Sequence, residues 1–114
     1  MKMIVDDTLG IAQTASAFAA LGSEQRLTVL RALVRAGDEG LNIGELGERT
    51  GITGSTLTHH VKLLAQAGLV DQVKTGRVIR CAVSYDRIRD LSTYLLQECC
   101  ADSKNPDQTE HTHD

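Results

Sequence analysis

Apolar residues recur at three- and four-residue steps along most of the first hundred positions, a spacing that places them on one face of a helix. The pattern predicts a first helix over residues 8–20. A second helix runs from a cap at Ser23 to Gly37, and a last helix covers residues 86–100. The chain is therefore expected to be mainly helical at both ends.

Between these helices lies a pattern typical of a helix-turn-helix. Asn42 is suited to cap a short helix over residues 43–49. Gly51 is suited to the sharp turn behind it, because glycine adopts left-handed conformations without strain. Ser55 or Thr53 is suited to cap a further helix that runs to about residue 67.

Two short segments of strand-like composition come next, residues 70–73 and 78–83. The four residues between them include Lys74 and Arg77, so they form the basic tip of a β-hairpin. With the helices before and after it, this hairpin completes a winged helix-turn-helix. The expected fold class is mainly α with a small β-hairpin.

Length and composition agree with one domain over residues 1–100, followed by a tail over residues 101–114. A chain of 114 residues buries only about two-thirds of its unfolded surface, so two cores are not expected. The tail is polar and lacks apolar periodicity, which predicts disorder. No stretch approaches the roughly 20 apolar residues that cross a bilayer, and no secretory signal is evident. We expect a cytoplasmic protein without a membrane partner.

The net charge indicates a binding surface only when it is calculated separately for each segment of the chain. The whole sequence has a formal charge of −3, which argues against coating nucleic acid by bulk positive charge. Residues 55–80, however, hold four basic side chains and one acidic side chain, whereas the segments before and after are net negative. The aromatic residues, two Tyr and one Phe, are too few to form a platform for stacking single-stranded bases. The middle segment is a candidate surface for duplex DNA.

The second helix of a helix-turn-helix fits the major groove, with the side chains of its first two turns at the base edges. The candidate DNA contacts are Ser55, Thr56, Thr58, His59, His60 and Lys62 on this helix, and Lys74 and Arg77 on the hairpin tip. The alternative is a small helical bundle with both histidines on a solvated face, but the basic segment and hairpin favour DNA. Adjacent histidines on a helix point about 100° apart, so they do not predict a metal site.

Three stretches resemble the ArsR/SmtB family of bacterial winged-helix transcriptional repressors: ALGSEQRLTVLRALVRAG from residue 20, LNIGELGERTGITGSTLTHHVKLLAQAGLV from residue 41, and TGRVIRCAV at the end of the hairpin. The resemblance implies a homodimer, joined through the first and last helices, that binds palindromic double-stranded operator DNA. It also implies that DNA binding requires no cofactor and that an inducer releases the operator. The small and apolar faces of those two helices agree, because they exceed what a monomer core needs.

The three cysteines do not form a disulfide framework, and a reducing compartment keeps them as thiols. Cys81 alternates with Ile79 and Val83 on one strand face, so it is expected in the core and is the weaker metal candidate. Cys99 and Cys100 are adjacent at the end of the last helix, and neighbouring helical positions face different ways. Packing of the last helix therefore does not account for both cysteines.

The family resemblance suggests a ligand for this pair. The Cys-x-Cys of the family's founding arsenic sensors is replaced here by Asn42 and Gly44, and the last helix lacks the histidines of its zinc sensors. Some members that sense arsenicals carry a vicinal cysteine pair at the end of the last helix, as this sequence does. Trivalent arsenic is thiophilic. Two thiols suffice for methylarsenite, which brings a carbon ligand, whereas arsenite or antimonite needs a third thiol, for example from the partner chain. Cys99 and Cys100 are thus predicted to bind a trivalent arsenical.

Other functions remain open from the sequence. The pair could sense another soft metal ion, with His111 and His113 as further ligands. It could instead sense a redox or persulfide signal, although a disulfide between neighbours closes a strained ring. An enzyme is not expected, because the chain has no Cys-x-x-Cys, no glycine-rich phosphate loop and no histidine near a candidate nucleophile. A protein-interaction module that no longer binds DNA is the remaining alternative.

Overall fold

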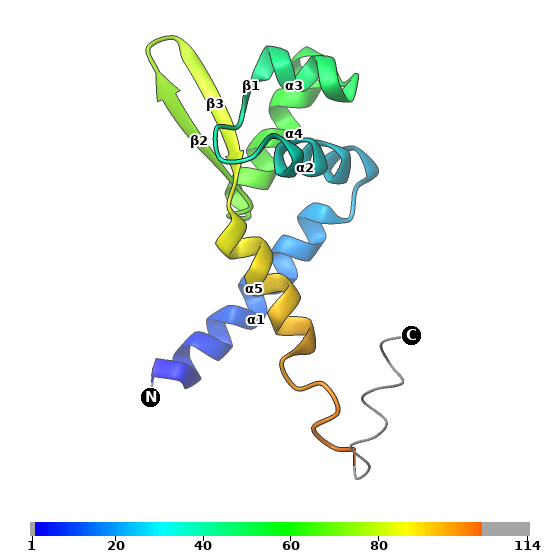
Figure 1. Cartoon of the computed structure of the whole chain (residues 1–114). Coiled ribbons are helices and arrows are strands. Elements are labelled where there is room, and N and C mark those ends of the chain that lie inside the picture. The colour runs from blue at the N-terminus through cyan, green and yellow to red at the C-terminus, as the bar shows by residue number, and fades with distance from the viewer. Residues whose placement is uncertain (1, 104–114) are drawn as a thin grey trace.

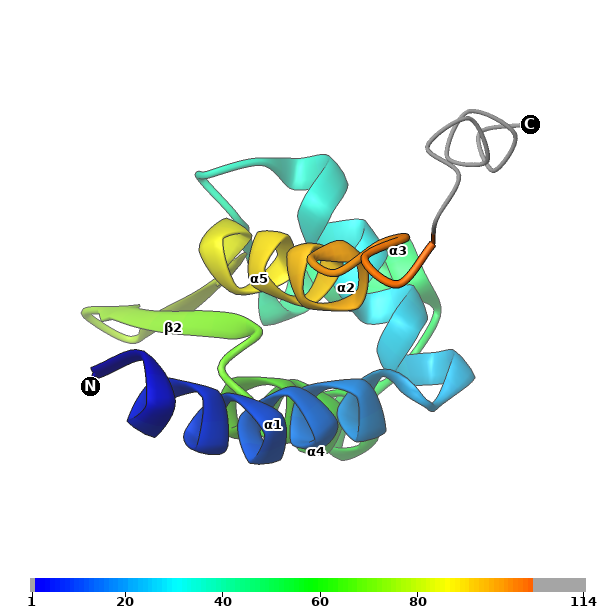
Figure 2. The ribbon, with the colours of Figure 1, turned by 90° about the horizontal axis from the view of Figure 1, so that it is seen from below.

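The chain folds into two regions that extend in opposite directions (Figure 1). The computed structural model describes the backbone of residues 2–103 and the side chains from residue 10 onward. Its helices are α1 (Lys2–Leu21), α2 (Glu24–Ala36), α3 (Ile43–Thr50), α4 (Gly54–Gln66) and α5 (Tyr85–Leu96), and its strands are β1 (Leu41–Asn42), β2 (Val70–Thr75) and β3 (Val78–Val83). One region holds α2, α3, α4 and the sheet. The other holds α1 and α5, with α1 alongside α4 when the molecule is seen from below (Figure 2).

The predicted helix-turn-helix is confirmed. Ser23 caps α2 by accepting a hydrogen bond from the backbone N–H of Arg26. Asn42 and Glu45 form a capping box at the start of α3, in which each side chain accepts the backbone N–H of the other residue. Gly51 follows α3 with a φ of 76°. This left-handed conformation favours glycine and turns the chain into α4.

The predicted hairpin is also confirmed, and a short strand that the sequence pattern did not predict joins it. β2 and β3 pair antiparallel with Thr75 opposite Val78, so only Gly76 and Arg77 form the tip and Lys74 lies in β2. β1 pairs with the other edge of β3, which gives the strand order β1-β3-β2. A strand of two residues is too short to show the alternation by which strands are predicted.

One apolar core lies between the helix-turn-helix and the base of the hairpin. Its largest fully buried side chains are Leu33, Leu46, Leu57, Leu64, Leu69, Val29, Val61 and Cys81. The prediction that Cys81 is a core residue is confirmed. Ile79 on the same strand is exposed, because the outer half of the hairpin extends beyond the helices.

Both terminal helices differ in extent from the prediction. α1 begins at Lys2 rather than at residue 8. α5 ends at Leu96, so the helix predicted to reach residue 100 is one turn too long. The N–H of Cys99 bonds to the carbonyl of Leu96 three residues back, and Cys100 has a φ of 63°, which cannot continue a helix.

The tail expected to be disordered lies outside the described residues from residue 104 onward, and with it His111 and His113. Its first residues form turns, in which Ala101 and Ser103 each donate a backbone hydrogen bond to a carbonyl three residues back. Within the described part of the chain, no helix is both long enough and apolar enough to cross a bilayer.

Candidate nucleic-acid interface and cysteine pair

The outward face of α4 carries a row of polar side chains. Leu57, Val61 and Leu64 point into the core, which fixes the rotation of the helix about its axis. The exposed positions are Ser55, Thr56, Thr58, His59 and Lys62. Five of the six helix residues predicted to contact DNA therefore lie in solvent, and these five form the polar row of α4.

His60 is the exception, and its placement corrects the expectation that it reaches DNA. Its side chain is only 9% exposed and faces α2. Its Nε2 lies 2.7 Å from Oε1 of Gln25, and its Nδ1 lies 3.4 Å from the Arg26 guanidinium. Burial, the Arg26 charge and neighbouring His59 lower the pKa of His60 below its ordinary value. The 100° step between helical neighbours explains why His59 is exposed and His60 is not.

The hairpin tip presents the other two predicted DNA contacts. Lys74 and Arg77 are both exposed. Figure 1 shows the tip at the same end of the molecule as α3, away from α1 and α5. The polar row and the basic tip therefore both belong to the helix-turn-helix region.

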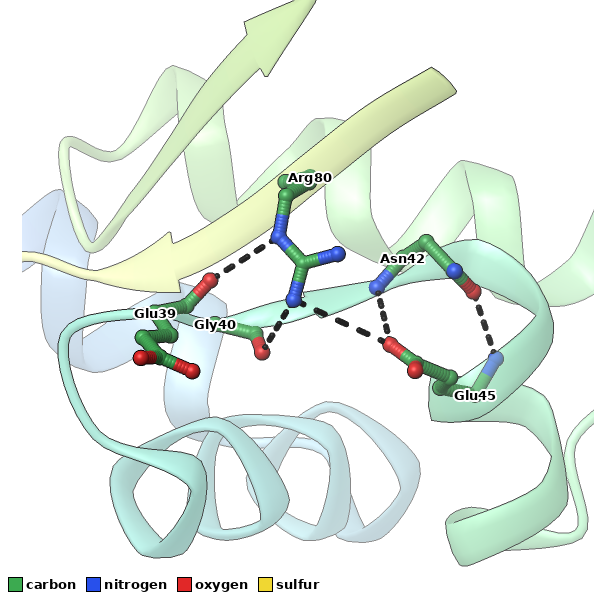
Figure 3. Close-up of polar contacts among 5 residues, drawn as sticks. All are labelled: Glu39, Gly40, Asn42, Glu45 and Arg80. Atoms are coloured by element: carbon green, nitrogen blue, oxygen red, sulfur yellow. Dashed lines mark hydrogen bonds and ion pairs between the residues drawn. The ribbon is translucent and has the colours of Figure 1, made fainter. Parts of the chain in front are cut away.

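Arg80, which contributes to the positive charge of the middle segment, forms contacts inside the protein (Figure 3). Its Nε donates to the carbonyl oxygen of Glu39 at 3.0 Å, and its terminal nitrogen donates to that of Gly40 at 3.0 Å. The same nitrogen lies 4.0 Å from Oε1 of Glu45, which also accepts the N–H of Asn42. Arg80 thus ties the base of the wing to the loop before β1 and to the start of α3.

Cys99 and Cys100 form a thiol pair in the turn after α5. Cys99 is exposed and Cys100 is half-buried, and their sulfur atoms lie 3.6 Å apart. A disulfide has an S–S distance of about 2.05 Å, so both residues are thiols here. The hydrogen bond with Cys99 raises the pKa of the Cys100 thiol above its ordinary value. The structure thus brings the two predicted sensor residues together.

Cys81 belongs to a different part of the molecule. It is fully buried in β3, and burial raises the pKa of its thiol. The 12 residues of α5, about 18 Å of helix, separate it along the chain from the thiol pair. Among the described residues, no three or more His, Cys, Asp or Glu side chains lie close enough to share a metal ion. The described part of one subunit therefore offers a thiophilic ligand two sulfur atoms.

An apolar surface opens between α1 and α5. A cavity of about 180 Å³ separates the two helices, lined by Phe18, Leu21, Leu30, Ile88, Leu91, Ser92 and Leu95. Phe18 is 37% exposed and Leu95 is 66% exposed. We call the surface around this cavity the α1–α5 face. Large apolar side chains that remain exposed together are typical of an interaction surface.

Known proteins share both the sequence pattern and this geometry. A family model described as a helix-turn-helix domain matches residues 21–73. The HTH-type transcriptional regulator YceK of Bacillus subtilis (strain 168) is 37% identical over 81 residues, which cover 71% of this chain and 77% of YceK. An ArsR-like transcriptional regulator from Rhodococcus sp. RHA1 superposes with a TM-score of 0.69 at 29% identity, over 82% of this chain and 84% of that one. The chain belongs to the HTH-type transcriptional regulators, and its fold is that of an ArsR-like regulator.

A second similar structure has the same fold as this regulator. It is the homodimeric winged helix-turn-helix DNA-binding domain of Mb0332 from Mycobacterium bovis, with a TM-score of 0.64 and 19% identity over 88% of this chain and 93% of that domain. The helix-turn-helix match of the regulator includes all of α2, α3 and α4 but neither α5 nor the cysteine pair. Family membership therefore rests on the helix-turn-helix region and on the fold, independently of the cysteines.

Proposed function

We propose that this regulator is a homodimeric repressor of the ArsR type that places α4 of each subunit in the major groove of a palindromic operator. The observation that carries the proposal is the polar row of α4, held outward because the opposite face of the helix is fixed in the core. Its hydroxyl and imidazole groups can donate and accept hydrogen bonds at base edges. Lys62, Lys74 and Arg77 bind phosphates, which position the protein. Binding requires no cofactor and takes place in the cytoplasm.

The α1–α5 face supports the homodimer. Its cavity and exposed leucine are features that a second copy would cover in a two-fold symmetric contact. The Cα radius of gyration is 17.1 Å, above the value of about 13 Å for a compact domain of 100 residues. Mb0332, which has this fold, is homodimeric. A dimer formed in this way presents two α4 helices, which must lie about 34 Å apart to enter successive major grooves.

The cysteine pair supports an arsenical as the inducer. Two thiolates bound at 2.3 Å to one tetrahedral ion lie about 3.8 Å apart, and the narrower bond angles of a pyramidal three-coordinate centre bring two sulfur atoms somewhat closer. The observed distance of 3.6 Å between the sulfur atoms of Cys99 and Cys100 is close to this value, so both can bind one small soft centre with little movement. Two sulfur ligands match methylarsenite, whose methyl carbon occupies the third position on arsenic.

Proton balance favours an arsenical over a divalent cation. Methylarsenite carries two hydroxyl groups, and when both are exchanged, two As–O bonds break and two As–S bonds form. Each thiol proton then leaves with a hydroxyl group as water. The raised pKa of Cys100 does not oppose this exchange. A zinc-like ion binds thiolates instead and must release those protons to solvent, which a raised thiol pKa disfavours at neutral pH.

The test is release of DNA from the full-length protein bound to the promoter fragment upstream of its own gene. Methylarsenite and arsenite are titrated separately, and we expect methylarsenite to release DNA at the lower concentration. A coupling free energy of about 1–3 kcal/mol lowers DNA affinity about 5- to 150-fold. Cys99→Ser and Cys100→Ser are expected to bind DNA and to ignore the arsenical. Cys81→Ala is the matched control and keeps the response, because this thiol lies in the core.

Each other outcome changes the proposal in a defined way. Equal responses to arsenite and methylarsenite would indicate a third thiol from the partner chain. Release by an oxidant or a persulfide, with both arsenicals inert, would replace the arsenical by a redox signal. A normal arsenical response in either serine variant would remove the sensor role of the pair. Failure of the wild-type protein to bind any upstream fragment would refute the repressor itself.

A further inference from the structure

Three helices meet at the buried side chain of His60. Gln25 and Arg26 reach it from the first turn of α2, with the Gln25 oxygen 2.7 Å from Nε2 and the Arg26 guanidinium 3.4 Å from Nδ1. Arg26 also donates through Nε to the carbonyl oxygen of Ala20 at 2.6 Å, in the last turn of α1. A continuous chain of hydrogen bonds therefore connects the end of α1 to α4 through one arginine.

Arg26 determines the tautomer of this histidine. A guanidinium has only N–H donors, so Nδ1 of His60 must present its lone pair to Arg26. The proton of the neutral ring is then on Nε2, and Nε2 requires an acceptor, which Oε1 of Gln25 supplies. Every polar atom of the ring has a partner only while the imidazole is neutral. A proton on Nδ1 would direct an N–H group at a cation.

We propose that the chain Ala20–Arg26–His60–Gln25 is the link that holds α4 in its DNA-binding orientation and connects that orientation to α1. His60 acts as a positioning residue: it contacts no base, but it holds α4 in place against the first turn of α2 and, through Arg26, against the end of α1, while the apolar core fixes the rotation of α4 about its own axis. This inference rests on the proposed function, in which α4 contacts DNA and α1 lies in the dimer contact. Protonation of His60 then breaks the link and weakens DNA binding.

The surroundings of the link allow it to open. Arg26 lines a cavity of about 360 Å³ between α1 and α4, together with small residues of α1 and with Leu63 and Gln66 of α4, so its guanidinium has room to move away from His60. The charged or titratable groups acting on His60 are Arg26 from α2 and His59 on α4, and both disfavour a proton on the ring. Opening would free α4 from the first turn of α2 while the apolar core contacts of Leu57 and Val61 remain.

The test compares the DNA affinity of the full-length wild-type protein with that of His60→Gln between pH 8 and pH 5. The glutamine side chain can still donate an N–H to Gln25 but does not titrate. The ratio of their affinities for the upstream promoter fragment at pH 8 is the reference. As the pH falls, the wild-type protein should lose affinity relative to the variant by about fivefold or more. Titration of His59 is present in both proteins, so the ratio of affinities isolates His60.

A second variant, Gln25→Glu, should raise the pH at which the loss of DNA affinity occurs. A carboxylate beside Nε2 favours the charged ring and raises the pKa of His60, so the loss of affinity should begin at a higher pH. Gln97→Glu adds the same charge at an exposed position just after α5, outside the helices that form this link, and should leave the midpoint unchanged. The pKa of His60 in each protein is measured by NMR titration of its imidazole.

The outcomes separate the two proposals. If the wild-type protein does not bind the fragment at pH 8, the proposed repressor function fails. If it binds, but its pH profile parallels that of His60→Gln or is not shifted by Gln25→Glu, only the positioning role of His60 is refuted.

Discussion

The helix pair α3 and α4 buries Leu46, Leu57 and Leu64 fully or almost fully, whereas α5 leaves Leu95 and Leu96 66% and 65% exposed. The apolar packing of the helix pair is therefore provided within one chain. The end of α5 leaves an apolar surface that a second copy would cover in the proposed dimer. In that dimer, each subunit fixes the shape of its own DNA-reading surface, while the contact between subunits sets the spacing of two such surfaces.

Polar contacts differ less between the two regions. Arg80 and His60 each join segments far apart in sequence within the helix-turn-helix region. The start of α5 is also joined to distant segments, through hydrogen bonds from Tyr85 to α2 and from Arg87 to α1. The cysteine pair follows the exposed last turn of α5. In the proposed repressor, a ligand at that position alters the subunit contact without unfolding the DNA-reading region.

The largest expected effect comes from a charge on the α1–α5 face. Leu95→Glu should fold, because this side chain is already exposed in one subunit, but it should sediment as a monomer. Loss of simultaneous binding to two half-sites should lower operator affinity about 100-fold or more. Leu27→Glu is the control, since Leu27 is an exposed apolar residue of α2 and should leave the dimer intact. A dimeric Leu95→Glu protein would contradict the difference between the two regions.

Gly40→Ala should destabilise the DNA-reading region strongly. Gly40 has a φ of 70°, and an added Cβ would overlap the carbonyl oxygen of Cys81 on the neighbouring strand. Backbone strain and overlap together should lower the free energy of unfolding by about 3 kcal/mol. Gly51→Ala has similar backbone strain but open space around the added atom, so it should lower stability by only about 1–2 kcal/mol. Urea denaturation of both variants measures the difference in stability. Equal losses of stability would show that the overlap with the Cys81 carbonyl oxygen is relieved.

Substitution of two arginines in the same hairpin should affect different properties: Arg77→Ala should change the salt dependence of DNA binding, whereas Arg80→Ala should lower stability. Arg77→Ala should leave stability within about 0.5 kcal/mol of wild type and reduce the slope of log affinity against log salt by about 1. Arg80→Ala removes hydrogen bonds to two backbone carbonyls and should lower the free energy of unfolding by about 1–2 kcal/mol. Binding titrations between 50 and 200 mM salt, with denaturation in parallel, check both expectations. An unchanged salt slope in Arg77→Ala would contradict the assignment of Arg77 as a phosphate contact.

The smallest expected effect is a dependence of stability on pH. The pKa of His60 lies below 6.5 in the folded protein, so below pH 6.5 the unfolded chain binds more protons than the folded chain. The free energy of unfolding should therefore fall as the pH is lowered from 6.5 toward the folded pKa. The contribution of His60 should be constant above this range. Urea denaturation of wild type and His60→Gln between pH 8 and pH 5 isolates the contribution of His60. Parallel curves of unfolding free energy against pH would contradict this contribution.

Features controlled by neighbours in sequence could be predicted. Ser23 and Asn42 cap the helices that follow them, and Gly51 makes the turn between α3 and α4, because each acts on backbone groups a few residues away. The polar row of α4 follows from helical periodicity once Leu57, Val61 and Leu64 are assigned to the core. The adjacency of Cys99 and Cys100 is a property of the sequence itself.

Features controlled by distant partners could not be predicted. Arg77 and Arg80 look alike in the sequence, and only the pairing of β1 with β3 brings Arg80 to the carbonyl oxygens of Glu39 and Gly40. His59 and His60 look alike too, and the first turn of α2 is what buries one of them. The end of α5 was missed because residues 97–100 continue the helical composition while the backbone of Cys100 is left-handed.

The sequence by itself determined a winged helix-turn-helix with a basic hairpin and a vicinal thiol pair, because caps, turns and periodicity act over a few residues. The tertiary structure decided which basic and imidazole groups remain available to DNA and which hold the protein together. It also placed the two thiols after the end of α5, with their sulfur atoms 3.6 Å apart. It left the α1–α5 face open in a single subunit. Those outcomes depend on contacts between segments tens of residues apart, which local spacing does not encode.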